Sequence, residues 1–560
     1  MKQHTPRRQP ATRRRRAFVS SSAGFLLSLA GTIVVAATPT EPDPSFTDAA
    51  LHRHIGALAS DAFGGRFPGT PGEVLTLDYL EKGFAAAGAQ PAYGDSYRQA
   101  VPLVSWTFDP APTLSVAGPD FQADLEFGVD MIASTGLLRE EVTVQDSPLV
   151  FAGYGIVAPE YGWNDYAGLD VRGKTVVVLV NDPGFATGDP ALFTGRAMTY
   201  YGRWTYKFEE AARQGAAAVL VVHEDEPASY GWEVIAQGAT KRRGLRGANR
   251  DEAMATVEGW LSAATARRLC AAAGEDFDTL KAAAQRPGFR ARALGELRAT
   301  ARVQSRLAES DSYNIVAVIP GSERPEEVVL FTAHWDHLGR DGAEIYNGAV
   351  DNASGTAGLL VLAEAYAKMD PPPARSIAFV AVTAEEQGLL GSAHYAAQPA
   401  FPLENTVAVI NIDGLNYIGP TRDISVVGYG ASELDEFVDQ AAAKQGRKVL
   451  PDQRPEAGSY YRSDHFNLAK RGVPALYPRM GLDLLDGGTA RGKALSQAYN
   501  DERYHKPADE YSPTQDWRGG ALDLLLYFDI GRALAMSSDW PNWTPGNEFR
   551  AIRDIQRPAD

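Results

Sequence analysis

The stretch that decides the fold is Val328-Val329-Leu330-Phe331-Thr332-Ala333-His334-Trp335-Asp336-His337. Its first six residues form an almost continuous apolar run, which predicts a strand buried on both faces, and polar residues follow at its end. Similar runs occupy residues 315–319, 377–382, 407–412 and 473–477, with helical patterns over 356–369 and 432–445. This alternation predicts an α/β fold, in which a mixed, mostly parallel central sheet is flanked by helices on both faces.

Acidic residues and histidines follow the ends of several predicted strands or precede a predicted helix. They are His334, Asp351, Glu385, Glu386, Asp413 and, in a C-terminal loop, His505. Ligands bind beyond the carboxyl ends of the strands in open α/β sheets. We therefore expect these side chains to converge at one edge of the central sheet.

Several carboxylates packed in one crevice would repel one another and raise each other's pKa values unless a cation neutralises them. Two imidazoles with three carboxylates suit a pair of divalent ions, zinc foremost, with one carboxylate bridging them. The absence of cysteine ligands leaves cobalt and manganese as substitutes. One of the neighbouring residues Glu385 and Glu386 could bind metal while the other transfers protons.

Each of these residues also has a purely structural interpretation. Asp351 alone would be a helix N-cap, the two adjacent glutamates a solvated first helical turn, and His334 a packed core histidine. Their joint occurrence at strand ends favours the metal site. We expect His394 and His465, in contrast, to be packed structural histidines.

The composition excludes several classes of protein. The chain has 560 residues with 54 Lys+Arg against 70 Asp+Glu, a formal net charge of −16. A general nucleic-acid binder needs a basic surface, so this class is excluded. The single cysteine, Cys270, excludes an intrachain disulfide and a cysteine-based metal cluster, and its surroundings predict a buried position on a helix.

The N-terminus carries an export pattern. Four arginines at 13–16 precede an apolar stretch over 18–37 that ends in Val35-Ala36-Ala37, small residues that a signal peptidase reads. Arg15-Arg16 with the residues after them resembles a twin-arginine signal. We expect residues 1–37 to be an export signal, and the mature protein to be periplasmic or secreted without stable membrane association. A single membrane anchor is the alternative.

The rest of the chain divides by sequence texture. We expect an N-terminal helical part over 38–110 (helical periodicity runs over 46–103), an inserted β-rich region over 111–300, a catalytic domain over 301–545 and a tail over 546–560. The inserted region contains no constellation of catalytic residue types. Its Gly153-Tyr154-Gly155 resembles a dinucleotide fingerprint, but Pro159 follows where the helix should open, so we expect a loop.

Several different short motifs follow one another along the chain. They are Phe63-Gly64-Gly65-Arg66, Thr332-Ala333-His334-Trp335-Asp336-His337-Leu338-Gly339, Asn347-Gly348-Ala349-Val350-Asp351-Asn352-Ala353-Ser354-Gly355, Thr383-Ala384-Glu385-Glu386-Gln387-Gly388, Asn411-Ile412-Asp413, Ser463-Asp464-His465 and Tyr504-His505. Together they resemble the co-catalytic di-zinc exopeptidases, in the bacterial aminopeptidase branch that carries an inserted protease-associated domain. Residues 174–222 are similar to that inserted domain.

The resemblance implies a set of metal ligands. His334 and Asp413 would bind one zinc ion, and Glu386 and His505 would bind the other. Asp351 would bridge the two ions.

The resemblance also implies residues that act on the substrate. Glu385 would be the general base toward a water shared by the metals, and Tyr504 would stabilise the oxyanion. Asp336 would orient the histidine ligand, a common function of carboxylates behind a metal. Arg462, just before Ser463-Asp464-His465, would assist substrate binding.

The activity that the resemblance implies is removal of N-terminal residues from peptide substrates. Three alternatives remain: a carboxypeptidase or dipeptidase of the same family, a single-zinc glutaminyl cyclase-like acyltransferase, and a non-catalytic receptor-like binding module. The intact ligand positions argue against the last of these, because loss of metal binding predicts eroded ligands.

Overall fold

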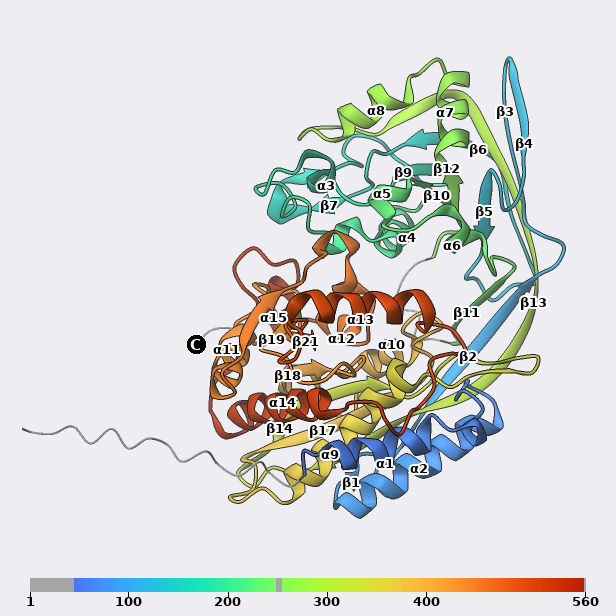
Figure 1. Cartoon of the computed structure of the whole chain (residues 1–560). Helices are drawn as coiled ribbons and strands as arrows, with labels where there is room; N and C mark the ends of the chain where they lie inside the picture. The colour runs from blue at the N-terminus through green and yellow to red at the C-terminus, as the bar shows by residue number, and fades with distance from the viewer. Residues whose placement is uncertain (1–44, 248–253, 558–560) are drawn as a thin grey trace, which may run out of the picture. The chain divides into compact units, whose positions relative to one another are not determined.

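A computed structural model describes residues 45–247 and 254–557 of the chain. The expected export signal over 1–37 lies outside these residues. Two sheets that share the long strand β13 (Arg292–Ile319) organise the described part (Figure 1). None of the helices described there is both long and apolar enough to cross a bilayer.

The first sheet contains all the strands that the sequence predicts after residue 313. Its order is β1 (Gln90–Pro91), β13, β17 (Arg375–Val382), β14 (Arg324–His334), β18 (Thr406–Asn411), β21 (Ala475–Met480), β19 (Asp423–Val427) and β20 (Lys448–Pro451). The strands β17, β14, β18 and β21 run parallel. The mixed, mostly parallel α/β sheet predicted from the sequence is therefore confirmed.

The run 315–319 departs from the parallel arrangement, because this end of β13 is antiparallel to β17. The cause is the connection. Only residues 320–323 separate β13 from β14, whereas a parallel crossover needs a dozen residues or more. The chain therefore reverses direction between these two strands.

Alternate residues of β14 face two separate hydrophobic cores. Val329 and Phe331 pack in one core, and Val328 and Leu330 pack in the other. The first core is covered by α1 (Asp48–Leu58), α2 (Pro71–Ala87), α9 (Gly355–Ala367), α11 (Leu434–Lys444) and α14 (Arg518–Met536), and the second by α10 (Leu390–Ala397) and α12 (His465–Ala469). Helices thus cover both faces, and each buried large apolar side chain contributes about 1.5–3 kcal/mol.

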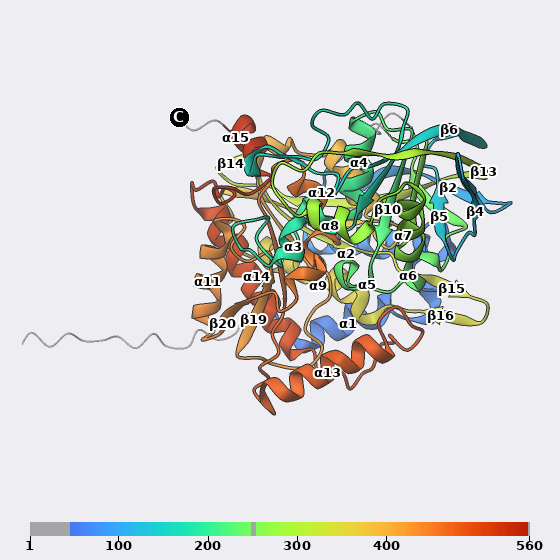
Figure 2. The same cartoon turned by 90° about the horizontal axis from the view of Figure 1, so that it is seen from above.

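Local signals fix the helix ends. The side chain of Thr47 accepts the N–H of Ala50 and caps α1, while α2 begins with Pro71 at its first position and ends before Gly88 in the left-handed conformation. Figure 2 shows α14 beside α9 and α11, which it also contacts, and the outlying α13 (Gly488–Glu502). The last described helix is α15 (Arg550–Gln556).

The second sheet belongs to the region between residues 111 and 304. Its order is β4 (Phe121–Leu125), β3 (Thr113–Gly118), β13, β6 (Glu141–Phe151), β9 (Thr175–Leu179), β10 (Ala218–His223), β12 (Val257–Ser262) and β5 (Met131–Ser134). The strands β6, β9, β10 and β12 run parallel. Helices α4 (Trp204–Arg213), α7 (Ala263–Ala272) and α8 (Phe277–Ala284) accompany them, and Cys270 is buried on α7 as predicted.

The pairing of β2 (Arg98–Phe108) with β13 connects one sheet to the other. The strand β2 pairs antiparallel with residues 305–315 of β13, and β11 (Lys241–Leu245) pairs with the opposite edge of β2. The helical periodicity expected over 46–103 therefore ends too late, because residues 98–103 are already strand. Burial of alternate residues such as Val101 and Leu103 against Ala384 stabilises the strand there.

Candidate metal centre

The structure brings together the five residues expected to bind metal. His334 is the last residue of β14, and its Nε2 lies 3.3 Å from Asp351 Oδ1 and 3.3 Å from Asp413 Oδ1. His505 follows α13, and its Nε2 lies 3.2 Å from Asp351 Oδ2 and 3.2 Å from Glu386 Oε2. Asp351 thus contacts both imidazoles, one with each carboxylate oxygen.

The donor set fits divalent zinc. The ligand atoms of His334, Glu385 and Asp413 lie within 4.8 Å of one another, and so do those of His334, Asp351 and Glu386. Imidazole nitrogens and carboxylate oxygens are common zinc ligands, and the same set accepts cobalt or manganese.

The electrostatics of the cluster also favour a cation. Burial opposes protonation of His505, but hydrogen bonds with Asp351 and Glu386 raise its pKa to about 10. Burial raises the pKa of Glu385 well above its ordinary value, and the neighbouring Glu386 and Asp413 add to this shift against the opposing effect of His334. The site therefore holds more negative charge than its imidazoles neutralise.

The backbone of Glu385 contacts the carboxylate of Asp336. The Glu385 N–H donates to Asp336 Oδ1 at 3.0 Å, and burial raises the pKa of Asp336 to about 7. The closest acceptor for His334 Nδ1 is the carbonyl oxygen of Asp336 at 3.1 Å, since the carboxylate lies 3.9 Å away. Asp336 therefore contacts the histidine through its main chain and the glutamate through its carboxylate.

Two hydroxyl groups hold Asp413, and the sequence prediction missed both. Ser463 Oγ donates to Asp413 Oδ2 at 2.7 Å, and the Tyr477 hydroxyl donates to the same oxygen at 2.9 Å. Asn411 Nδ2 donates in turn to Ser463 Oγ at 2.7 Å. The signal for Ser463 was its place directly before Asp464-His465, in a motif that the prediction used only as a family marker.

The loop that carries Asp351 is fixed by Asp509, a third residue that the prediction missed. Asp509 Oδ2 accepts the N–H of Val350 at 3.2 Å and the N–H of Asp351 at 3.1 Å. Gly348 in the same loop has φ 53°, and a Cβ there would collide with the carbonyl oxygen of Asp351. Only glycine allows this conformation at no steric cost.

Arg66, from the motif Phe63-Gly64-Gly65-Arg66, ties the N-terminal region to the same loop. Its fully buried guanidinium donates to the carbonyl oxygens of Trp335, Asn347 and Gly348 at 2.9, 2.6 and 3.0 Å. The motif had been noted only as a family marker, and the structure shows its contacts with the site.

His337 is a further missed residue. Its ring is fully buried, and its Nδ1 lies 2.7 Å from Glu386 Oε1. The signal was its spacing three residues after His334. His394 and His465 are buried outside this cluster, as expected, and the His465 ring packs against Tyr460 and Tyr477.

The two residues expected to contact substrate lie at the rim. The Tyr504 ring is 46% exposed and stacks on the His505 ring with centroids 4.0 Å apart. Arg462 is exposed, and its guanidinium carbon lies 5.6 Å from the centroid of the Tyr230 ring, which belongs to the inserted region.

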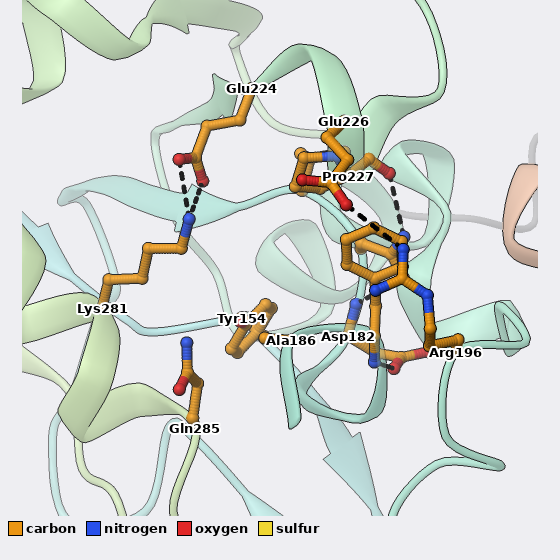
Figure 3. Close-up of a pocket in the computed structure, with 12 residues that line it drawn as sticks. Tyr154, Asp182, Ala186, Arg196, Glu224, Glu226, Pro227, Lys281 and Gln285 are labelled. Atoms are coloured by element: carbon orange, nitrogen blue, oxygen red, sulfur yellow. Dashed lines mark hydrogen bonds and ion pairs between the residues drawn. The ribbon is translucent and has the colours of Figure 1, made fainter. Parts of the chain in front are cut away.

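A separate cavity of about 400 Å³ lies in the inserted region, at the carboxyl ends of β9 and β10 (Figure 3). Four of its five charged side chains form two ion pairs with each other. Lys281 Nζ lies 2.6 Å from Glu224 Oε2, and Arg196 Nη2 lies 3.2 Å from Glu226 Oε1. Among the charged residues that line this cavity, Asp182 alone forms no ion pair, so its excess of negative charge is smaller than that of the cluster of His334 and Asp351.

Comparison with known proteins agrees with this geometry. Residues 314–521 match the model of Peptidase family M28. A probable zinc metalloprotease of Leptosphaeria maculans is 38% identical over 103 residues, which cover 18% of this chain and 23% of that protein. The aminopeptidase NAALADL1 of Mus musculus is 38% identical over 116 residues, which cover 20% of this chain and 15% of that protein. The chain thus matches less than a quarter of the length of these relatives.

Among solved structures, an aminopeptidase from Aneurinibacillus sp. strain AM-1 is similar with a TM-score of 0.46 and 18% sequence identity. The similarity covers 88% of this chain and 94% of that chain.

Proposed function

We propose that this chain is a zinc-dependent metallo-exopeptidase that removes N-terminal residues from peptides, since residues 314–521 match the model of Peptidase family M28. The observation that carries the proposal is the contact of Asp351 with both His334 and His505, each of which contacts a further carboxylate. Such a set suits a pair of divalent ions.

We assign the ligands as follows in this proposal. His334 and Asp413 would hold one zinc ion, Glu386 and His505 would hold the other, and Asp351 would be a ligand common to both. Zinc bound there would supply an acidified water and polarise the peptide carbonyl. Cobalt or manganese can take the same positions.

The chain's own residues perform the remaining steps. Glu385, half-buried beside the ligands, takes a proton from the attacking water and gives one to the departing amine. The Tyr504 hydroxyl donates a hydrogen bond to the developing oxyanion. The Asp336 carboxylate accepts a hydrogen bond from the backbone N–H of Glu385 and so fixes the main chain that carries the base. The carboxylates of the site hold the cationic α-amine of the substrate, which confines cleavage to the first residue.

We further propose that residues 1–37 direct export to the periplasm or the medium, and that the region 111–300, inserted between the parts 38–110 and 301–545, contains a protease-associated domain. Parallel strands with accompanying helices in that region support this proposal. Mass spectrometry of the exported protein tests the signal, with Thr38 as the expected first residue. A mature chain that retains residues 1–37 contradicts it.

Metal analysis and a cleavage profile of the purified full chain test the activity. We expect about two zinc ions per chain, and hydrolysis of aminoacyl-nitroanilides but not of their N-acetylated forms. Cleavage of the N-acetylated peptides from the carboxyl end would instead indicate a carboxypeptidase. One zinc with cyclisation of N-terminal glutamine would indicate a glutaminyl cyclase, and a protein without bound metal or hydrolysis would overturn the proposal.

A further inference from the structure

Three arginines, one of them directly before Ser463 of the candidate metal centre, have no acidic partner among the described residues. Among residues 45–247 and 254–557, the guanidinium groups of Arg203, Arg454 and Arg462 form no hydrogen bond or ion pair with a carboxylate. A cationic cluster that stays unneutralised is available to a ligand.

Arg203 is the most informative of the three. It lies between η3 (Tyr200–Gly202) and α4, its side chain is only 9% exposed, and its buried Nε has no hydrogen-bond partner. Burial and the nearby charge of Arg462 lower its pKa to about 10. A buried, unpaired charge is costly, so its retention calls for a compensating group.

Arg203 and Arg462 lie close together although they come from different regions of the chain. The guanidinium carbon of Arg462 lies 5.6 Å from the centroid of the Tyr230 ring, and the segments that carry the two arginines meet where the Met198 N–H donates to the Pro455 carbonyl oxygen at 3.1 Å. Tyr200 lies three residues before Arg203, and Tyr461 directly precedes Arg462. The centroids of these two tyrosine rings are 6.2 Å apart.

The pair also lies next to the reacting groups. Arg462 directly precedes Ser463, whose hydroxyl donates to Asp413. Arg462 also lies within electrostatic reach of Tyr504. The Tyr504 ring in turn stacks on His505. A substrate held at the metals would therefore extend past these arginines.

We propose that Arg203 and Arg462 together bind a carboxylate of the peptide substrate, and that the enzyme therefore prefers anionic short peptides. The proposal rests on the exopeptidase function proposed above. A guanidinium group donates two parallel N–H hydrogen bonds to the two oxygens of a carboxylate. A neutral amide, with one oxygen and no charge, cannot take the place of that carboxylate. The shared chemistry is a carboxylate, whether it is the C-terminus of a dipeptide or the side chain of an acidic residue.

Matched substrate pairs test the proposal on the full, zinc-loaded chain. The pairs are Leu-Leu against Leu-Leu-amide, Leu-Glu-amide against Leu-Gln-amide, and Glu-Leu-amide against Gln-Leu-amide. We expect kcat/KM to favour the carboxylate member of at least one pair by about 10- to 100-fold, as charge-assisted hydrogen bonds provide. The pair that shows the preference identifies the source of the carboxylate.

Two substitutions assign the preference to the arginines. In Arg462→Gln, at an exposed position where folding is not at stake, the ratio within that pair should fall to about one. Arg203→Gln should do the same, and Arg203→Lys should restore part of the ratio because it keeps the charge. Arg172→Gln is the matched control, since this exposed arginine of the inserted region already pairs with Asp170 at 2.7 Å and should leave the ratio unchanged.

The outcomes separate this inference from the proposed function. Equal cleavage of both members of every pair overturns the carboxylate site and leaves the exopeptidase intact. An equal loss for both members in Arg462→Gln also overturns it, because a structural defect does not distinguish charge. If no peptide is cleaved, the proposed function fails. Calorimetric binding of the same peptides to the zinc-loaded Glu385→Gln protein, with and without Arg462→Gln, then still decides whether carboxylate binding depends on Arg462.

Discussion

The two sheets that share β13 carry polar residues at the same topological position and use them differently. In the second sheet, Asp182 follows β9 and Glu224 follows β10. In the first sheet, β14 ends at His334 and Asp413 follows β18. Both sets lie at the carboxyl ends of parallel strands, where open α/β sheets bind ligands.

The difference is charge balance. In the second sheet, Glu224 pairs with Lys281, and Asp182 accepts hydrogen bonds from the Gly184 N–H at 3.0 Å and the Thr199 hydroxyl at 2.8 Å. In the first sheet, Asp351 and Asp413 face imidazoles and other carboxylates. Convergence at strand ends is thus a consequence of topology, whereas an unbalanced, buried set of acids indicates a metal.

Removal of metal should have the largest effect and should act on the first sheet alone. We expect a chelator to abolish hydrolysis, and zinc to restore it, because the carboxylates then lack their neutralising cations. The free energy of unfolding should also fall, by about 2.7 kcal/mol if the metal had been at a hundred times its Kd. Activity assays and thermal unfolding measure both effects, and an unaffected chelated enzyme would contradict the metal assignment.

The next largest effect should come from Glu385→Gln. We expect kcat to fall by about 10²–10⁴-fold, because the base is lost, while zinc content stays at the parental value. The matched control is Glu224→Gln in the second sheet, which should change kcat less than twofold since it acts only on the pair with Lys281. Parental hydrolysis of aminoacyl-nitroanilides by the Glu385 variant would refute the base assignment.

Tyr504→Phe should have a smaller effect. Loss of one oxyanion donor lowers kcat by about 10²-fold, and KM and metal content should change little, because the ring still stacks on His505. Steady-state kinetics with metal analysis of the same sample check this. Loss of zinc in this variant would show that Tyr504 acts through His505 instead.

The smallest effect concerns stability in acid. Burial lowers the pKa of His54 on α1 to about 4, so the unfolded state, with its ordinary value of 6.5, binds more protons between these pH values. Stability is therefore full above pH 6.5 and falls as the pH drops toward 4, by roughly 2 kcal/mol between pH 7 and pH 5.

Urea unfolding of the parent and of His54→Gln at these two pH values measures this contribution. The difference between the two proteins should shrink at pH 5. Burial also lowers the pKa of His223 in the second sheet, so His223→Gln reports the corresponding contribution of that region. An equal difference at both pH values would show that His54 is not neutral in the folded state.

The sequence was sufficient for what local pattern encodes. Apolar runs predicted β14, β17, β18 and β21, and residues at their ends predicted the cluster around His334 and Asp351. It was not sufficient for partners far apart in the chain. The contact of Arg66 with Asn347 spans 281 positions, and β17 enters the sheet between β13 and β14 although it follows both in the chain. Arg203 beside Arg462 is likewise a product of tertiary structure.

The ladder between β2 and β13 has a consequence for the modular use of this chain. Phe108 stands opposite Ser305, so the entry and exit of the inserted region are neighbours across a single pair of strands. A tight turn joining these two positions would close a hairpin and excise nearly 200 residues without breaking the first sheet. The inserted region can therefore be deleted as a unit. The shortened chain would retain the candidate metal ligands but lack Arg203.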